Sequence, residues 1–397
     1  MNLKIILFIV FALPFTTAFS QWTSLNSGTI NNLNSICFTD SITGWIVGES
    51  GTSKNTMDGG TIWYDNGPGT YNYNSVYFTD FANGNSVGDA GNGFMTPSTG
   101  IFWFAATGLG ANNLNSVYFT NPNMGWICGD SGKIFKTVNG SSLNGVLWTN
   151  IMSGVTLSLN SVFFPSTTLG WVVGNNGTIL NSINSGSSWI PQNSTVTVNL
   201  NSVHFSGVDS GWVCGDNGVI LFTSNHGINW TTQISGTTQN LNSIYFVDKK
   251  NGWAVGDAGT IISTDNGGIN WNPEMSGVTQ NLNSVSFSGL NFGWASGNNG
   301  TLIKYQPPLT EINNQLERDL QISVFPNPAS AQTTFRFSKN TNALITIQDV
   351  FGKIIFEVSI NNHPQVTIPV ANFPNGMYFI KISVNNKSVI KKIVITS

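Results

Sequence analysis

Residues 241–271 read LNSIYFVDKKNGWAVGDAGTIISTDNGGINW. Three runs, Leu241–Val247, Gly252–Gly256 and Thr260–Thr264, are rich in β-branched and aromatic residues, and a fourth run begins at Trp271. The breaks between them contain Gly, Asn or Asp, which favour tight turns. This alternation predicts four short antiparallel strands joined by turns.

The stretch recurs along the chain. Its opening tripeptide, Leu-Asn-Ser or Tyr-Asn-Ser, occurs seven times, with the central residue at Asn34, Asn74, Asn115, Asn160, Asn201, Asn242 and Asn283. The spacing between successive copies is 40 to 45 residues. A four-stranded unit that repeats at this period is typical of a β-propeller blade. The sequence therefore predicts an all-β fold with a seven-bladed β-propeller over residues 21–305.

The two ends of the repeat region complement each other. The seventh copy ends at Leu302–Tyr305 without a fourth strand or its tryptophan. Trp22 precedes Asn34 by twelve residues, and Trp230 precedes Asn242 by the same number. We therefore expect Gln21–Gly28 to supply the missing strand of the seventh blade, with Trp22 as the structural residue of closure. Closure removes the open sheet edge that an incomplete blade exposes.

The N-terminus has the pattern of a secretory signal peptide. One lysine at position 4 precedes an apolar run from Ile5 to Phe15, and Ala18-Phe19-Ser20 supplies a small-residue cleavage site. This run is too short for a membrane anchor, and no later stretch reaches the roughly 20 apolar residues that a spanning helix needs. We expect residues 1–20 to be removed and the mature chain to be exported, with no transmembrane segment.

The chain carries few charges and few cysteines. Charged residues make up 8% of it, against about 25% in an average protein. Residues 21–305 contain thirteen Asp and Glu and six Lys, and this acidic balance argues against a nucleic-acid partner. Cys37, Cys128 and Cys214 have no metal-ligand spacing, and the last two occupy equivalent strands two blades apart. We expect neither a disulfide nor a cysteine-based metal site.

A Gly-Trp pair heads the second strand of six blades. The pairs are Gly44-Trp45, Gly125-Trp126, Gly170-Trp171, Gly211-Trp212, Gly252-Trp253 and Gly293-Trp294. The second blade has Gly84-Asn85 instead. Two interpretations are open for these tryptophans: a belt that stacks on sugars, or packing between neighbouring blades. Their regular repetition favours packing.

A Ser/Thr-x-Asp/Asn-x-Gly-x-x-Trp corner recurs at residues 56–63, 182–189, 223–230 and 264–271, with a weaker copy at 96–103. In the third blade an insertion around Gly140–Val146 displaces Trp148. The corner resembles the Asp-box of sialidases and sortilin-like receptors, where it holds a turn and takes no part in catalysis. With the Leu-x-Ser-x-x-Phe and Gly-Trp-x-x-Gly patterns, it makes residues 21–305 similar to the photosystem II assembly/stability-factor family. This resemblance implies a seven-bladed propeller and leaves the function open.

A third recurring feature is the turn between the second and third strands, which holds one acidic or amide residue per blade. Its amides are Asn175 and Asn298, and its carboxylates are Glu49, Asp89, Asp130, Asp216 and Asp257. In a propeller this turn shares a face with the loops that lead into each blade, such as Thr195–Asn199, Gly236–Asn240 and Gly277–Asn281. The carboxylates are therefore candidate binding residues for a cation or a basic partner, and the neutral polar loops suit a glycan. The alternative is that these residues only favour turns before glycine.

The residue inventory gives little support for catalysis. Sialidases bind the substrate carboxylate with clustered arginines, and the only arginines here, Arg318 and Arg336, lie outside the propeller. His204 and His226 belong to no recognisable triad or metal motif. The remaining glycosidase candidates are Asp65, Asp209 and Glu274, and nothing in the sequence pairs them as hydrolysis requires. We expect a non-catalytic binding scaffold with no catalytic residues, cofactor or metal ion; the alternative is a secreted glycoside hydrolase of the Asp-box propeller type.

The pattern changes after the repeats. Residues 306–320 include Pro307-Pro308 and several charges, and we expect them to form a linker. Beyond them, strand-like runs near Thr333–Phe337, Ala343–Gln348, Ile354–Ile360 and Gln365–Pro369 predict a small β-sandwich over residues 321–397.

Residues 321–397 closely resemble the type A C-terminal sorting domain of the type IX secretion system of Bacteroidetes. The motifs that carry this resemblance are Val324–Pro328, Asp349–Lys353, Pro374–Lys381 and the terminal strand Lys391–Ile395. The resemblance implies that the type IX secretion machinery recognises this domain in the periplasm, exports the protein and usually removes the domain. The expected location is secreted or on the outer cell surface, where the propeller would meet an unknown surface protein or glycan. An ordinary carbohydrate-binding sandwich is the alternative.

Overall fold

The computed structural model describes residues 21–142, 146–306, 320–349, 353–384 and 387–396. The chain divides into two compact units, residues 1–307 and 308–397, and each is described by itself. The expected signal peptide lies outside the described residues, as does the expected linker apart from Gln306 and Leu320.

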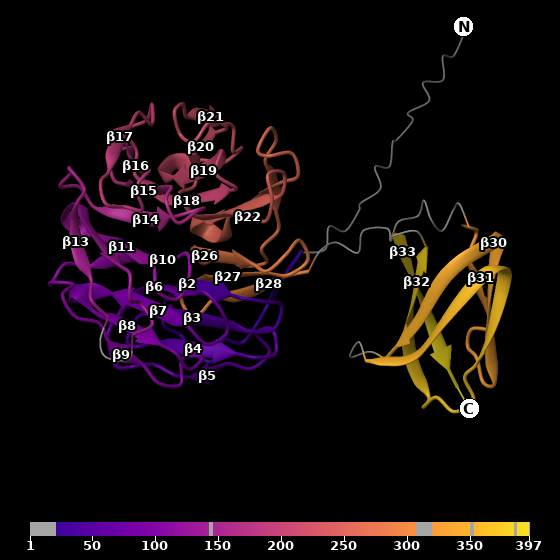
Figure 1. Ribbon diagram of the computed structural model, residues 1–397. Coiled ribbons are helices and arrows are strands. Elements are labelled where there is room, and N and C mark those ends of the chain that lie inside the picture. Colours follow the sequence, from indigo (N-terminus) through magenta and orange to yellow (C-terminus); the bar gives the residue numbers. More distant parts are fainter. Residues whose placement is uncertain (1–20, 143–145, 307–319, 350–352, 385–386, 397) are drawn as a thin grey trace, which may run out of the picture. The chain divides into compact units, whose positions relative to one another are not determined.

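The first unit contains seven four-stranded antiparallel sheets arranged around a centre (Figure 1). Blades 1 to 3 consist of β2 (Leu33–Phe38), β3 (Gly44–Gly48), β4 (Ser53–Thr56), β5 (Tyr64–Asp65), β6 (Tyr73–Phe78), β7 (Gly84–Gly88), β8 (Gly93–Thr96), β9 (Phe104–Ala105), β10 (Leu114–Phe119), β11 (Gly125–Gly129), β12 (Lys133–Thr137) and β13 (Thr149–Met152). Blades 4 to 6 consist of β14 (Leu159–Phe163), β15 (Gly170–Gly174), β16 (Thr178–Ser182), β17 (Ile190–Gln192), β18 (Leu200–Ser206), β19 (Ser210–Gly215), β20 (Ile220–Thr223), β21 (Thr231–Gln233), β22 (Leu241–Phe246), β23 (Gly252–Gly256), β24 (Ile261–Thr264) and β25 (Asn272–Glu274). Blade 7 consists of β26 (Leu282–Phe287), β27 (Gly293–Gly297), β28 (Leu302–Tyr305) and β1 (Trp22–Ser24).

The N-terminal strand completes the seventh blade. β1 runs antiparallel to β28, with Trp22 opposite Tyr305. Trp22 is only 2% exposed and its ring lies 5.3 Å from that of Tyr305. The expected fold, a seven-bladed propeller closed by a strand from the N-terminus, is confirmed.

Stacked aromatic pairs join neighbouring blades. Each tryptophan of the Gly-Trp motif lies parallel to a phenylalanine of the next blade, with ring centroids 3.5 to 4.0 Å apart; the pairs are Trp45–Phe78, Trp126–Phe164, Trp171–Phe205, Trp212–Phe246, Trp253–Phe287 and Trp294–Phe38. The glycine before each tryptophan makes room for a phenylalanine of its own blade: a Cβ at Gly44 would lie 2.5 Å from the Phe38 ring. The tryptophans therefore belong to the packing between blades.

The recurring tripeptide forms two closed circles of hydrogen bonds around the ring. Its first residue is fully buried in every blade. The Asn Nδ2 donates at 2.9 to 3.1 Å to the carbonyl of the equivalent first residue in the next blade, as Asn74 does to Leu114. The Ser Oγ accepts a backbone N–H from the next blade at 3.2 to 3.3 Å, as Ser75 does from Val117. These contacts between blades explain why the tripeptide recurs in all seven repeats while the residues around it vary.

The Asp-box corners hold the turns between the third and fourth strands. In blade 1, Asp58 Oδ1 accepts the N–H groups of Thr61 and Ile62, and Thr56 Oγ1 accepts that of Gly60 at 3.0 Å. Burial alone would raise the pKa of Asp58, but the hydrogen bonds from the backbone N–H groups and from the Thr56 hydroxyl together lower it. This geometry gives the corner a structural role.

The second unit is a small β-sandwich. It consists of β29 (Ser323–Phe325), β30 (Gln332–Gln348), β31 (Ile354–Pro369), β32 (Gly376–Val384) and β33 (Lys387–Ile395). β30 pairs with β29 through its first half and with β32 through its second half, and a register irregularity near Thr341 separates the halves. Phe335, Ile345 and Ile380 belong to a single buried core. Within the described parts of the chain, every helix is too short or too polar to cross a membrane.

Candidate binding surfaces of the propeller

The turns between the second and third strands have the same backbone geometry in every blade. Each contains two successive residues with positive φ, the first at 52–58° and the second, a glycine, at 67–75°. This pair forms a two-residue hairpin turn of type I′, whose twist matches that of the flanking strands. The first positions are Ser50, Ala90, Ser131, Asn176, Asn217, Ala258 and Asn299.

Four of the predicted carboxylates accept hydrogen bonds from two side-chain amides each. Asp89 accepts from Asn74 Nδ2 at 2.9 Å and from Asn72 Nδ2 at 3.1 Å. The donors lie 15 and 17 residues earlier, where the chain leads into the blade. Each carboxylate therefore ties its turn to the preceding inter-blade loop. The equivalent trios are Asp130 with Asn113 and Asn115, Asp216 with Asn199 and Asn201, and Asp257 with Asn240 and Asn242.

The same amides also connect one blade to the next. Asn113 Nδ2 donates to Asp130, while its Oδ1 accepts the N–H of Ala90 in the preceding blade at 3.1 Å. Turns and loops therefore share one side of the propeller, which we call the inter-blade face; it comprises the seven type I′ turns and the loops Thr195–Asn199, Gly236–Asn240 and Gly277–Asn281.

The remaining members of the turn ring differ in their contacts. Asn175 and Asn298 each accept one side-chain amide hydrogen bond, from Asn160 at 3.0 Å and Asn283 at 2.9 Å. Within the described residues, Glu49 accepts none from an amide side chain. All five carboxylates, Glu49 included, are half-buried, so they keep part of their surface in contact with solvent.

Shallow clefts recur on the inter-blade face. The cleft in blade 5 measures about 630 Å³ and is lined by Asn217–Val219 and Thr232–Gln239. Equivalent clefts in blades 6 and 3 measure about 440 and 430 Å³. Their walls are mainly Ser, Thr, Asn, Gln and Gly, which offer hydrogen-bonding groups without charge.

The three carboxylates considered for glycoside hydrolysis have separate structural partners. Asp65 pairs with Lys54 at 2.6 Å and Asp209 with Lys249 at 3.1 Å. Glu274 accepts the indole N–H groups of Trp22 and Trp253. The three come from blades 1, 5 and 6.

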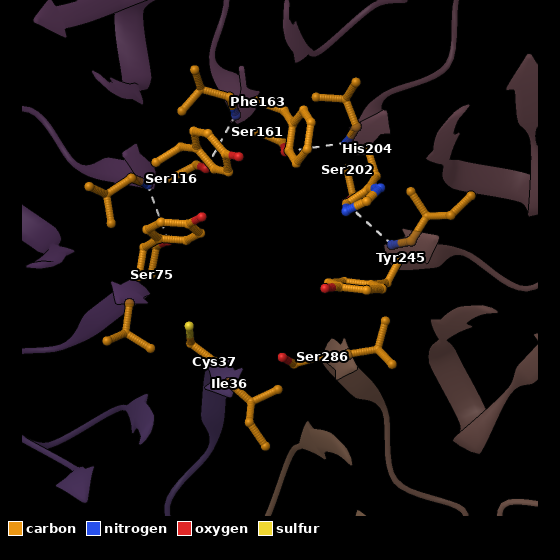
Figure 2. Close-up of a pocket in the computed structure, with 18 of the residues that line it drawn as sticks. Ile36, Cys37, Ser75, Ser116, Ser161, Phe163, Ser202, His204, Tyr245 and Ser286 are labelled. Carbon is orange, nitrogen blue, oxygen red and sulfur yellow. Dashed lines mark hydrogen bonds between the residues drawn. The ribbon is translucent and has the colours of Figure 1, made fainter. Parts of the chain in front are cut away.

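The two propeller histidines have different surroundings. His226 is exposed in its Asp-box corner, where Nδ1 lies 3.1 Å from the carbonyl of Val208. His204 lines a pocket of about 390 Å³ at the centre of the ring, which we call the central pocket (Figure 2). Burial lowers the pKa of His204 to about 3, so the ring is uncharged at neutral pH.

The central pocket is a feature that the sequence analysis missed. Its wall comes from the first strands of all seven blades and contains no charged side chain. One residue per blade, three positions after the tripeptide Asn, recurs in this wall: Cys37, Tyr77, Tyr118, Phe163, His204, Tyr245 and Ser286. An alignment of the repeats would have shown that this position is aromatic in five of seven blades.

Two family models match the chain. One is described as photosynthesis system II assembly factor YCF48 and matches residues 141–237 and 232–306. The other is described as a secretion system C-terminal sorting domain and matches residues 323–396. No curated protein matches the chain significantly.

Solved structures share the propeller fold. YCF48 bound to a D1 peptide is 19% identical, with a TM-score of 0.62 over 73% of this chain and 96% of that one. YCF48 from Cyanidioschyzon merolae is 21% identical, with a TM-score of 0.60 over 72% and 98% of the two chains. PorZ, a surface component of the type IX secretion system of Porphyromonas gingivalis, is 12% identical, with a TM-score of 0.56 over 92% of this chain and 60% of that one.

Identities this low show the fold alone, whereas the sorting-domain match bears on location. Export by the type IX system places the protein in the medium or on the outer cell surface. The chain is thus an exported seven-bladed propeller that resembles the photosystem II assembly-factor repeats and ends in a C-terminal sorting domain of the type IX secretion system.

Proposed function

We propose that the exported propeller is a non-catalytic binding module whose inter-blade face takes a basic segment of a surface protein. The observation that carries this proposal is the set of Asp–Asn hydrogen bonds, which hold Asp89, Asp130, Asp216 and Asp257 in fixed positions. A surface that is ordered before binding loses less conformational entropy when a partner docks.

Charge and analogy support the same class of partner. The propeller has an excess of acidic residues, so it attracts basic partners over distances of about a Debye length. YCF48, a propeller of the same fold, has been solved with a peptide bound. By analogy, a peptide segment is a suitable ligand for this face as well.

A neutral glycan is the second candidate. The three clefts beside the turns favour it, because their walls offer amide and hydroxyl groups with little charge. A hydrolase finds less support. Asp65, Asp209 and Glu274 lie in three different blades, and each interacts with a structural partner of its own instead of facing another carboxylate.

The test is a parallel binding screen of the mature chain, residues 21–397, against basic peptides and neutral oligosaccharides. We expect binding of basic peptides that weakens as salt is raised, and no release of reducing sugar from any polysaccharide. Salt-independent binding of an oligosaccharide would favour the second candidate. Hydrolysis that a single Asp or Glu substitution abolishes would overturn the non-catalytic proposal.

A further inference from the structure

Five aromatic rings form a continuous arc around the central pocket. Tyr77, Tyr118, Phe163, His204 and Tyr245 come from successive blades, and each ring contacts the next at a centroid distance of 4.6 or 4.7 Å. The planes of neighbouring rings are tilted by 38 to 46° at every step. The constant spacing shows that one repeated backbone position sets the arc.

The arc is interrupted where blades 7 and 1 meet. At this position Ser286 and Cys37 replace the aromatic residues, and they are neighbours because the N–H of Phe38 donates to Ser286 Oγ at 3.1 Å. Figure 2 shows both small side chains beside the open centre, with the Tyr245 ring next to them. Two aromatic rings are therefore missing from an otherwise regular wall, which leaves a recess between Tyr245 and Tyr77.

The polar groups of the pocket limit the ligands it can take. No Asp, Glu, Lys or Arg lines it, so a charged ligand would lose its hydration without gaining an opposite charge. His204 Nδ1 is buried and has no hydrogen-bond partner among the described residues. Buried polar atoms normally have partners, so an unpaired ring nitrogen beside a cavity indicates a place for a ligand or water.

We propose that the central pocket binds a small uncharged aromatic molecule with a hydrogen-bonding group. Its ring occupies the recess over Cys37 and Ser286 and continues the stack between Tyr245 and Tyr77, and its polar group pairs with His204. Aromatic pairs gain energy beyond the burial of apolar area, so an aromatic ring is favoured here over a saturated one of equal size. This site is separate from the inter-blade face, and either can fail without the other.

The test is calorimetric titration of the mature chain, residues 21–397, with phenol and with indole. Cyclohexanol is the control ligand because it carries the same hydroxyl on a saturated ring. We expect both aromatic probes to bind, and cyclohexanol to bind about fivefold more weakly than phenol. The proposal is wrong if neither aromatic probe binds at millimolar concentration, or if cyclohexanol binds as tightly as phenol.

Variants of the recess test its location. Ser286→Tyr and Cys37→Tyr place a tyrosine where three other blades already have one, so they should fold and fill the recess, abolishing binding. Ile269→Tyr adds the same side chain at a position that is 80% exposed and outside the clefts of the inter-blade face, so phenol binding should not change. Unchanged binding by both recess variants, with melting curves that show them folded, would overturn the proposal.

His204→Phe tests the polar contact without depending on the recess variants. It keeps the aromatic arc, as Phe163 does in the adjacent blade, and replaces the imidazole by a somewhat larger ring without nitrogen atoms. Loss of one hydrogen bond should weaken phenol about threefold to tenfold. Equal affinity of this variant and the natural protein would rule out the role assigned to His204.

Discussion

Trp22 Nε1 donates a 2.7 Å hydrogen bond to Glu274 Oε2, across 252 residues of sequence. Glu274 Oε1 accepts a second indole N–H, from Trp253 at 3.2 Å. In the middle of the repeats Gln192 serves two indoles in the same way. The closing strand therefore reproduces an ordinary contact between blades, with the two partners taken from opposite ends of the propeller.

Replacing Trp22 by alanine should destabilise the whole ring. The loss of a buried tryptophan is expected to lower the free energy of unfolding by about 3–5 kcal/mol. Thermal unfolding followed by circular dichroism should show one transition moved to lower temperature, whereas Ile30→Ala, at a position 86% exposed, should leave it in place. A chain of residues 29–397 that melts at the temperature of residues 21–397 would contradict closure by the N-terminal strand.

Two substitutions test whether Glu274 has a structural role as a hydrogen-bond acceptor for the two indoles. Glu274→Gln keeps an acceptor for an indole, as Gln192 does, and should change the free energy of unfolding by less than about 1 kcal/mol. Glu274→Ala leaves two indole N–H groups without their acceptor, at a cost of about 1–3 kcal/mol for each that stays unpaired. Denaturant titration of both variants gives the comparison; equal destabilisation by the two would refute the acceptor role.

The turn ring should tolerate loss of its charge. We expect the combined change of Asp89, Asp130, Asp216 and Asp257 to asparagine to fold, because Asn175 and Asn298 already occupy this position. Each substitution loses one of two amide hydrogen bonds, at about 0.5–1.5 kcal/mol. This variant should bind a basic peptide more weakly than the natural protein, whereas its affinity for a neutral glycan should be unchanged. Calorimetric titration measures both. A variant that fails to fold would show that the carboxylates are needed for the structure itself.

Removal of residues 321–397 should separate folding from export. The propeller forms a compact unit of its own, so it should remain folded. Without the sorting domain it should accumulate in the periplasm. Fractionation of cells that express the full and the shortened chain measures this, and normal amounts of shortened protein in the medium would contradict the assignment.

The type I′ turns offer a matched pair of stability tests. Ala258 has a φ of 52°, which is costly for alanine and less so for asparagine. Ala258→Asn should therefore raise the free energy of unfolding by about 0.5–1 kcal/mol. Asn217→Ala, at the same position of the preceding blade, should change it in the opposite direction. Shifts of the same sign in the two variants would show that another contact dominates.

Periodicity was sufficient to predict the ring, because each blade carries its own strand and turn signals. The prediction for Gly252–Gly256 coincides with β23. Thr260 instead belongs to the preceding turn, where its N–H donates to the carbonyl of Asp257 at 3.0 Å, and Trp271 precedes β25. Such boundary residues combine a strand-forming side chain with a backbone that the neighbouring turn holds.

The binding surfaces were only partly predictable. The turn carboxylates could be found from their repetition, but their amide partners lie in the inter-blade loops and become visible only when the blades are assembled. The aromatic arc was missed for a related reason. Tyr77 and Tyr118 are far apart in sequence, and they come into contact at 4.6 Å only because the ring places successive first strands side by side.

The pairing of Thr23 with Lys304, 281 residues apart, also sets the order in which the protein can be completed. Most strands in a blade pair with strands that lie close to them in the sequence, so individual blades can form before the ring is complete. The first strand must wait until the last blade exists. Contacts this distant in sequence form slowly. We therefore expect β1 and β28 to pair in the final and slowest step of folding, after all the other strands of the propeller have formed.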